Sequence, residues 1–362
     1  MPPTLHDEEV GKKCAIRKLA AIGTRIAVAP YGMLTPMARP KKDNQELALF
    51  AAELNYERAN GEQEIGYMGR LFTQFSLPYK DPGDAVVWGR QSGNVKITVQ
   101  PGATIDNGVH RSYGYPFGGI PRLVLAHITT EVIRTSEERI DLGASQNAFM
   151  RTVGLGRATG GRTGNIARFQ TQTERLLRAN IVIDLKDPKQ QARSSALKLS
   201  VASSWDLWWS DGLDSDARTP RGKNSSVTVS SEFYRQVMDH PVPVDMKVLN
   251  ALQGSPMAMD IYIWLTYRMY ALETPYMISW ENLMLQFGSN LSDTKQGKHQ
   301  FKNDFEKRLK SVVQYWEDLK VDVDRARGLM LYPSPTHVPK RAPRRAQIPS
   351  SASTLAALPP SA

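Results

Sequence analysis

The sequence predicts an α+β protein that is mainly helical. Long segments in which apolar residues recur every three or four positions, as on one face of a helix, alternate with short segments in which every second residue is apolar, as in a strand. The order helix, strand, helix, turn, helix, hairpin occurs twice along the 362 residues. This is the order of a winged helix, so the sequence predicts two tandem winged-helix domains with β-hairpin wings.

The length agrees with two domains, because one domain usually takes ~100 to 200 residues. Changes in composition place the boundaries between them. The predicted parts are a flexible N-terminal arm over 1–43, a first winged-helix domain with an N-terminal extension over 44–210, a linker over 211–226, a second winged-helix domain over 227–332, and a disordered basic tail rich in Pro, Ser and Ala over 333–362.

In the first domain, Pro121 opens a helix with one apolar stripe, formed by Ile120, Val124, Ile128 and Val132. A short strand, RIDLGA, follows, and Ser145 caps a brief helix that runs to residue 150. The glycine-rich turn LGRATGGRTG then leads into a longer helix over 164–178. Two alternating segments, 181–185 and 196–201, form the expected hairpin wing.

The second domain repeats this order without repeating the residues. A helix over 257–272 is followed by a short helix within SWENLMLQFG, a basic turn, and a helix from about 298 to 316. The stretch VDVDRARGLMLY then predicts a hairpin. The third helix has an apolar face at spacings of three and four, formed by Phe301, Phe305, Leu309, Val312, Val313 and Trp316.

The charge of the chain favours a polyanionic partner. The formal net charge is +10 and the isoelectric point is near 9.5. Clustered Lys and Arg gain affinity for nucleic acids by releasing counterions from phosphates, although solvated surface charge alone gives the same totals.

The helix over 164–178 is the main candidate for reading DNA. Its polar face carries Asn165, Arg168, Gln172 and Arg175 at spacings of three, four and three. Arg pairs with guanine, and Asn or Gln with adenine, in the major groove, which is wide enough for a helix. Asn and Gln interleaved with Arg, with no acid before Glu174, favour this function over a merely solvated helix face.

Phosphate contacts are expected next to this helix. Arg157, Arg162 and Thr163 lie in the glycine-rich turn before its N-terminus, where backbone N–H groups and the helix dipole also favour anions. Lys189 and Arg193 lie in the polar connection of the predicted wing, which would contact the DNA backbone or the minor groove.

The second domain has a comparable but more mixed surface. The predicted DNA-contacting residues there are Lys295, Lys298, His299, Lys302, Asn303 and Lys310 on or before the helix, and Arg325 and Arg327 at the hairpin tip. A solvated helix face explains the helix residues equally well, because Glu306 lies among them.

The sequence favours a protein that is not an enzyme and holds no cofactor or metal. GRATGGRT nearly matches a P-loop, but Arg162 stands where the phosphate-binding lysine belongs. The six histidines lie too far apart for a metal or nicking site, and Asp214 with Asp216, and Asp322 with Asp324, are better explained as exposed charge than as magnesium ligands. Primase and nickase activities are therefore disfavoured.

Three tryptophans and the single cysteine bear on packing and on the cellular compartment. Trp205, Trp208 and Trp209 are expected to close a core or a domain interface rather than to stack on bases. Cys14 excludes an internal disulfide, and no apolar run is long enough to span a membrane, so we expect a cytoplasmic protein without a membrane partner.

Several long segments resemble the RepA family of plasmid-encoded replication proteins, over roughly residues 34 to 332. They are LTPMARPKKDNQELALFAAELNYE, GYPFGGIPRLVLAHITTEVIRT, SQNAFMRTVGL with TGGRTGNIARFQTQTERLL, and SSEFYRQVMDHPVPVDMKVLNALQGSPMAMDIYIWLTYRMY with ISWENLMLQFG.

This resemblance implies a plasmid replication initiator. Such a protein is expected to bind repeated sites in double-stranded origin DNA, help open the origin, recruit the host initiator and the replicative helicase, and repress its own promoter. It could also form a homodimer. The alternatives are a winged-helix transcriptional regulator of plasmid maintenance genes, since fold does not fix function, and a structural nucleoid protein with little sequence preference.

Overall fold

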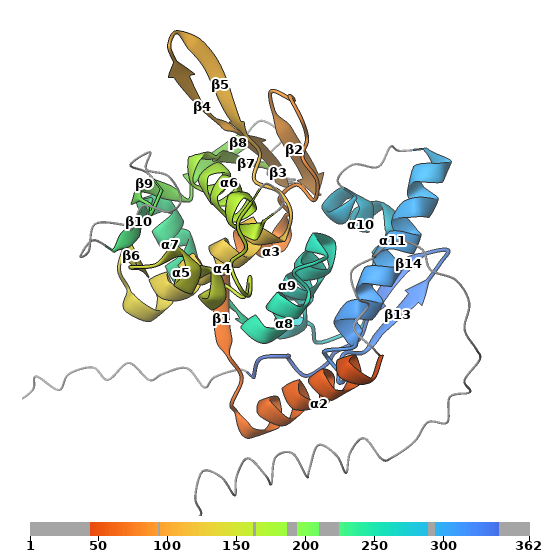
Figure 1. The fold of residues 1–362 in the computed structure, drawn as a ribbon. Coiled ribbons are helices and arrows are strands. Elements are labelled where there is room, and N and C mark those ends of the chain that lie inside the picture. Colours follow the sequence, from red (N-terminus) through yellow and green to blue (C-terminus); the bar gives the residue numbers. More distant parts are fainter. Residues whose placement is uncertain are drawn as a thin grey trace, which may run out of the picture.

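The computed structural model describes residues 44–92, 95–161, 164–186, 194–209, 224–288 and 294–339 (Figure 1). Helices and sheets alternate along the chain, so the predicted α+β class is confirmed. The predicted N-terminal arm, most of the predicted linker and most of the predicted tail lie outside the described residues.

The helices are, in chain order, α2 (Asn44–Asn60), α3 (Leu71–Gln74), α4 (Gly119–Thr135), α5 (Gln146–Thr152), α6 (Asn165–Arg178), α7 (Ser231–Asp239), α8 (Met246–Ala251), α9 (Pro256–Ala271), α10 (Trp280–Phe287) and α11 (Lys295–Val313). The strands are β1 (Ile65–Gly69), β2 (Trp88–Ser92), β3 (Val95–Gln100), β4 (Gly102–Asp106), β5 (Val109–Gly114), β6 (Arg139–Gly143), β7 (Asn180–Lys186), β8 (Ser194–Ser200), β9 (Ala202–Asp206), β10 (Ser225–Val229), β11 (Pro241–Asp245), β12 (Tyr276–Ser279), β13 (Val321–Asp324) and β14 (Gly328–Leu331).

All strand pairs in the described part of the chain are antiparallel. The spatial orders are β2-β3-β7-β8, β6-β10-β9, β12-β14-β13, β1-β11 and β4-β5. The hairpin predicted from 181–185 and 196–201 is confirmed as β7–β8. Its inner face is buried through Ile181, Ile183 and Leu199, and β2 and β3 extend the same sheet.

Helix α4 lies at the centre of the first half of the chain. Its predicted apolar stripe is confirmed, because Ile120, Val124, Ile128 and Val132 are all buried. The short helix α5 begins as predicted at Ser145, whose hydroxyl accepts a hydrogen bond from the backbone N–H of Ala148.

Strand β10 differs from the predicted domain division. Residues 225–229 include the predicted end of the linker at 226, and they pair with both β6 and β9 of the first half. Val227 and Val229 are each only 1% exposed, so the alternating apolar residues of this segment are buried between those strands. The next helix, α7, packs against α4 and β8. The chain therefore returns to the first half after the predicted linker.

The second half, α9 to β14, follows the predicted order, and its strand between the first two helices is β12. Strand β12 pairs with β14 beside the predicted hairpin β13–β14, which makes a three-stranded sheet. Helix α11 packs its predicted apolar face inward, with Phe301 and Phe305 at most 1% exposed. The helix ends at Val313, before the predicted end at 316, and Trp316 in the following turn is also buried. Trp280 meets Phe301 and Phe305 edge to face, with ring centroids 6.3 and 6.0 Å apart.

A buried ion pair joins the two halves. The guanidinium of Arg122 on α4 donates from Nε and Nη2 to the two carboxylate oxygens of Asp260 on α9, at 2.7 Å each. Both residues are buried, at 2% and 7% exposure. The same guanidinium donates to the carbonyl oxygens of Leu77 and Gly118 at 2.7 and 2.6 Å, so the connecting segment before α4 is held as well.

Helix α2 and the last described residues close the opposite side of the molecule (Figure 1). Helix α2 contacts α8 through the ion pair of Glu57 with Lys247, and it contacts the turn after α11 through Arg58 and Asp318. The N-terminal extension thus packs against the second half of the chain as well as the first.

Residues 333–339 differ from the predicted disordered tail, because they pack against the core. His337 is 1% exposed, its Nδ1 lies 3.0 Å from the Tyr262 hydroxyl, and its Nε2 lies 3.0 Å from the backbone oxygen of Tyr315. Burial lowers the pKa of His337 to about 4, so the ring is neutral at pH 7. Its N–H then donates to the Tyr315 carbonyl, and its other nitrogen accepts from the tyrosine hydroxyl.

Candidate nucleic-acid interface

The loop before α6 is built around the side chain of Asn165. The Asn165 Oδ1 accepts from the backbone N–H of Thr159 at 2.7 Å, and Nδ2 donates to the carbonyl oxygens of Leu155 and Arg157 at 3.3 and 3.0 Å. Both ends of the amide are therefore used within the chain. Asn165 shapes the glycine-rich turn, and a base contact would have to replace these bonds.

Arg157 is the predicted cation of this turn that the described residues include. Arg157 is exposed on the loop surface. Arg162 and Thr163, predicted beside it, lie outside the described residues, as do Lys189 and Arg193 in the connection between β7 and β8. The structure therefore presents one of these four predicted cations, Arg157, toward solvent.

Fewer of the polar residues predicted on the outward face of α6 are exposed than the sequence suggested. Ala167, Arg168 and Thr171 are exposed, whereas Gln172 is only 6% exposed. The prediction that Gln172 faces solvent is wrong, because its Oε1 accepts a hydrogen bond of 2.8 Å from the backbone N–H of Phe117, whose segment covers this turn of the helix. Arg168 makes no hydrogen bond or ion pair with the described residues.

Arg175 is also engaged within the chain. Its Nε donates to the carbonyl oxygen of Tyr113 at 2.7 Å, and its Nη1 contacts the carboxylate of Asp81 at 3.1 Å and the carbonyl oxygen of Tyr115 at 3.3 Å. The side chain is 19% exposed. Arg168, Thr171 and Arg175 line one side of a groove of about 310 Å³, and the segment 117–120 lines the other.

Two exposed lysines next to the predicted wing were not found from the sequence. Lys96 on β3 and Lys198 on β8 lie on the outward face of the four-stranded sheet, opposite the face that packs against the core. The alternation of β8 could have indicated Lys198, since its neighbours Leu197 and Leu199 point inward.

Helix α11 presents its predicted polar residues along one surface. Thr294 caps the helix by accepting from the N–H of Gly297 at 3.1 Å. The exposed predicted residues are Lys295, Lys298, His299, Asn303 and Lys310. Glu306, predicted to point outward with them, is buried at 9% exposure, which removes the acid that made this face mixed in the sequence.

The hairpin β13–β14 returns beside α11. Lys302 Nζ donates to the carbonyl oxygen of Arg325 at 3.0 Å and lies 5.3 Å from the centre of the Trp280 ring. Arg325 pairs with Glu306 at 2.7 Å, and Arg327 is exposed at the tip. The structure therefore brings Lys302 of the helix next to the predicted hairpin tip, which carries Arg325 and Arg327.

Backbone geometry fixes the tip of this hairpin. The Asp324 carboxylate accepts from the N–H groups of Ala326 and Arg327 at 2.8 and 3.0 Å, and these bonds lower the pKa of Asp324. Gly328 follows with φ +151°, and a Cβ there would lie 1.9 Å from the backbone oxygen of Ile278. Asp324 is thus a turn residue.

The three tryptophans behave as predicted. Trp205, Trp208 and Trp209 are partly buried against the core. Trp208 stacks on Phe149 with a centroid distance of 5.5 Å, and Trp209 meets Phe169 of α6 at 5.8 Å. Trp208 thus packs on α5, and Trp209 packs on the buried face of α6.

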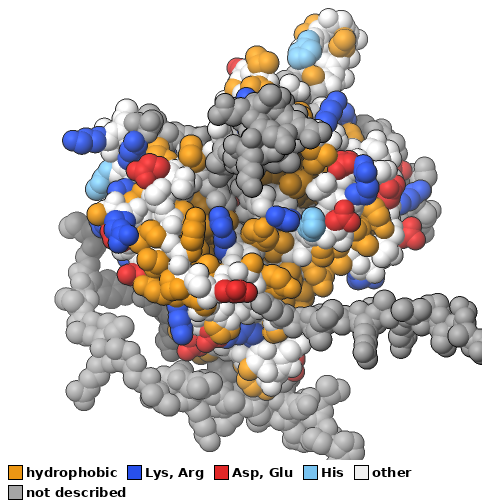
Figure 2. Space-filling model, turned by 180° about the vertical axis from the view of Figure 1, so that it is seen from behind, with side chains coloured by type: hydrophobic (Ala, Val, Ile, Leu, Met, Phe, Trp, Pro, Cys, Tyr) orange, Lys and Arg blue, Asp and Glu red, His pale blue; other side chains and the backbone are white. Residues whose placement is uncertain are grey.

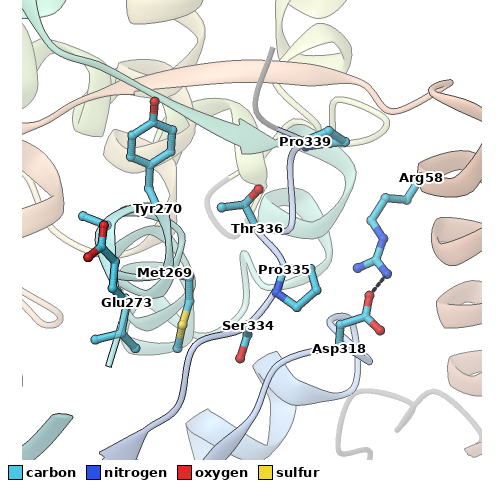
Figure 3. Close-up of a pocket in the computed structure, with 11 residues that line it drawn as sticks. Arg58, Met269, Tyr270, Glu273, Asp318, Ser334, Pro335, Thr336 and Pro339 are labelled. Atoms are coloured by element: carbon cyan, nitrogen blue, oxygen red, sulfur yellow. Dashed lines mark hydrogen bonds and ion pairs between the residues drawn. The ribbon is translucent and has the colours of Figure 1, made fainter. Parts of the chain in front are cut away.

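A different cavity, of about 540 Å³, lies between α2, the end of α9 and residues 334–339 (Figure 3). Arg58 and Asp318 form an ion pair across one side of it, and Met269, Tyr270 and Glu273 line the other. The paired charges leave little reason to expect an ionic ligand here.

Figure 2 shows the back of the molecule, where Lys and Arg are scattered among apolar and acidic side chains.

Within the described ranges, no three His, Cys, Asp or Glu side chains gather as a metal site would need. None of the helices described is both long and apolar enough to cross a membrane.

Comparison with known proteins bears on the first half most directly. Residues 115–282 match the model of the family described as "Plasmid encoded RepA protein", which confirms the family predicted from the sequence. The matched region contains α6 and ends within α10, so α11 and β13–β14 lie beyond it. No curated protein sequence matches this chain.

Two solved structures of domains 2 and 3 of RctB are similar to this chain at low identity. A selenomethionine derivative has 10% identity and a TM-score of 0.44, covering 73% of this chain and 96% of that one. A second crystal structure has 9% identity and a TM-score of 0.41, covering 72% and 94%.

Proposed function

We propose that this protein, whose residues 115–282 belong to the plasmid-encoded RepA protein family, is a plasmid replication initiator. It binds repeated sequences in double-stranded origin DNA through two winged-helix units and helps to open the origin. It acts in the bacterial cytoplasm, on plasmid DNA, and catalyses no reaction itself.

The family match carries this proposal, because the matched region includes α6 and the loop that precedes it. Arg168 is exposed there, next to Ala167 and Thr171, and makes no hydrogen bond or ion pair with the described residues. These three small or cationic side chains leave room for a base edge beside an Arg that can pair with guanine. Arg168 is therefore the side chain of α6 best placed to read sequence.

The second half supports a second DNA contact. Helix α11 exposes Lys295, Lys298 and His299 in its first turns, where the helix dipole also favours phosphate. Lys302 links this helix to the hairpin tip that carries Arg327. A winged helix uses this combination of helix and hairpin, with the helix in the major groove and the hairpin on the backbone.

The first half supports a winged-helix unit with an addition. The order α4, β6, α5, α6, β7, β8 is that of the motif, but β10 stands between β6 and β9 in the sheet. Recruitment of the host initiator and the helicase, repression of the protein's own promoter and a homodimeric state complete the proposal, and these rest on the family resemblance.

Footprinting on the DNA that flanks the gene tests the proposal. Purified protein with random competitor DNA at ~150 mM salt is expected to protect a series of direct repeats, with a preference of ~10³-fold or more over random sequence. A DNA circle carrying those repeats should replicate only when the protein is supplied. Protection of a single promoter-proximal inverted repeat without replication would indicate a transcriptional regulator instead.

A pair of variants connects the footprint with α6. Arg168→Ala is expected to lose repeat-specific protection and replication. Arg235→Ala, at an exposed arginine of α7 that pairs with Glu232, removes the same charge elsewhere and should leave both unchanged. Equal activity of the two variants would remove α6 from the proposed interface.

A further inference from the structure

A groove of about 530 Å³ lies between strand β2 of the first half and helices α10 and α11 of the second half. Strand β2 and helix α10 lie side by side there (Figure 1). The volume is within the ~300 to 1,000 Å³ of typical binding pockets. This groove shares no lining residue with the groove beside α6 or with the cavity beside α2. It is therefore a separate candidate for a binding site.

Strand β2 borders the groove with its open edge. It is the end strand in the order β2-β3-β7-β8, and among the described residues no strand pairs with its other side. Three consecutive residues of β2, 89–91, line the groove. Consecutive side chains of a strand point to opposite faces of the sheet, so a groove that touches all three borders the edge of the strand. Such an edge carries backbone N–H and C=O groups that can pair with a further strand.

Helix α10 gives the groove an apolar wall. Trp280, Met284 and Leu285 line it, and residues four apart lie on the same side of a helix. Trp280 is buried, whereas Leu285 is 47% exposed. Leu283 and Phe287, on the other side of α10, are buried and complete the packing of this helix. Leu285 is thus an apolar side chain beside the open edge of β2 that the fold leaves uncovered.

The charge of the groove is positive. Among the described lining residues, the cations are Arg90, Lys298 and Lys302, against one acid, Glu281. Arg90 donates from Nη1 to the carbonyl oxygen of Gln286 at 2.6 Å, and its Nε and Nη2 have no hydrogen-bond partner within the described part of the chain. Lys302 donates to a backbone carbonyl oxygen as well. These neutral acceptors leave positive charge beside the apolar wall, which complements an acidic partner.

The combination of these walls favours a protein segment as the occupant. DNA phosphates would meet the cations, but they would leave the apolar surface of Leu285 uncovered. A second copy of this chain, paired through its own β2, would bring the same cations close together, and like charges across an interface oppose association. A protein segment can supply a backbone for the edge of β2, apolar side chains for α10 and carboxylates for the cations.

We propose that this groove binds an extended segment of a partner protein that carries both apolar and acidic side chains. The backbone of the segment pairs with the open edge of β2. Its apolar side chains cover Met284 and Leu285. Its carboxylates lie against Arg90, Lys298 and Lys302. Proteins commonly recognise peptides by adding them to a sheet edge, where backbone hydrogen bonds give affinity and side chains give specificity.

The inference rests on the proposed function only for the role of the partner in replication, because binding of the segment requires no DNA site. Lys298 and Lys302 also belong to the surface of α11 that we propose contacts DNA. A bound acidic segment would therefore compete with DNA for these two lysines. The edge of β2 and the side chain of Leu285 belong to the groove alone.

Fluorescence anisotropy with the full-length protein tests the binding. The probe is a short fluorescein-labelled peptide in which Glu alternates with Val and Leu, and the control peptide has Lys in place of each Glu. The wild type should bind the acidic peptide saturably and the basic peptide not at all. Leu285→Ala should weaken the binding about tenfold, because an apolar contact is lost. Leu285→Glu should abolish it, because the new carboxylate also repels the peptide.

Hydrogen exchange locates the bound peptide, and matched variants control for general effects. Backbone amides in 89–91 should exchange more slowly when the acidic peptide is bound. Leu49 of α2 is 37% exposed outside the groove, so Leu49→Ala and Leu49→Glu should bind the peptide as the wild type does. The DNA footprint of Leu285→Ala should equal that of the wild type.

Several results would overturn the inference. These are a wild type that does not bind the acidic peptide, binding that both Leu285 variants leave unchanged, and exchange in 89–91 that the peptide does not slow. A footprint lost in Leu285→Ala would assign the groove to DNA instead. A change of oligomeric state in light scattering of Leu285→Glu would assign it to a second copy of the chain. A wild type that gives no footprint but binds the peptide through Leu285 overturns the proposed function alone.

Discussion

The buried pair of Arg122 and Asp260 should be the most sensitive joint between the two halves. Asp260→Asn keeps the shape of the side chain but leaves the Arg122 charge in a site that is 2% exposed, without its partner. Two bonds of 2.7 Å lose their charge, and the burial leaves no solvent to replace them. Removing one partner of such a pair costs about 3 to 5 kcal/mol of unfolding free energy.

Urea unfolding followed by tryptophan fluorescence measures this loss, because Trp264 lies on α9 with Asp260. The double variant Arg122→Met/Asp260→Asn has no buried unpaired charge. Its loss of unfolding free energy should therefore be smaller, by at least about 2 kcal/mol, than the sum of the losses of the two single variants. Glu131→Gln, in the exposed pair with Arg134, is the control and should leave the midpoint unchanged. Additive losses, or a loss for Asp260→Asn below about 1 kcal/mol, would refute the reasoning.

Three further predictions concern other parts of the molecule. Burial lowers the pKa of His337 from 6.5 to about 4, so the unfolded chain binds a proton more readily than the folded protein. The free energy of unfolding should therefore fall by about 3 kcal/mol as the pH drops from 6.5 to 4. Urea titrations measure this fall, and the variant His337→Asn should lack it. Gly328→Ala should destabilise the protein by about 1 to 3 kcal/mol in thermal unfolding, because its Cβ would meet the backbone of β12, while Gly254→Ala, with open space around it, should have no effect. In binding assays on DNA sites with single base changes, Arg168→Ala should cost about 1 to 3 kcal/mol of binding free energy at particular base positions. Asn165→Ala should instead weaken binding to all of these sites alike, because it loosens the loop before α6. A base-specific effect of Asn165→Ala would contradict the assignment of Asn165 to that loop.

The sequence predicted elements better than it predicted their partners. The stripe of α4, the cap of α5, the hairpin β7–β8 and the apolar face of α11 depend on local spacing, and all of them formed as expected. Strand β10 could not be placed in this way, because its insertion between β6 and β9 depends on strands more than 80 and about 20 residues earlier in the chain. The burial of His337 likewise depends on Tyr262, whose hydroxyl is needed to satisfy the ring.

The candidate site shows the same limit in its chemistry. Asn, Gln and Arg interleaved on α6 were interpreted as one reading surface, yet Asn165 holds the preceding loop, and Gln172 and Arg175 hold the segment 113–117. Polar side chains that can bond to base edges bond equally well to backbone N–H and carbonyl groups, so residue type alone cannot separate these roles.

These internal bonds give α6 a second function within the proposed interface. The segment that Gln172 and Arg175 hold leads directly out of β5, so the position of the β4–β5 hairpin follows the position of α6. Arg168 makes none of these bonds and stays exposed on α6.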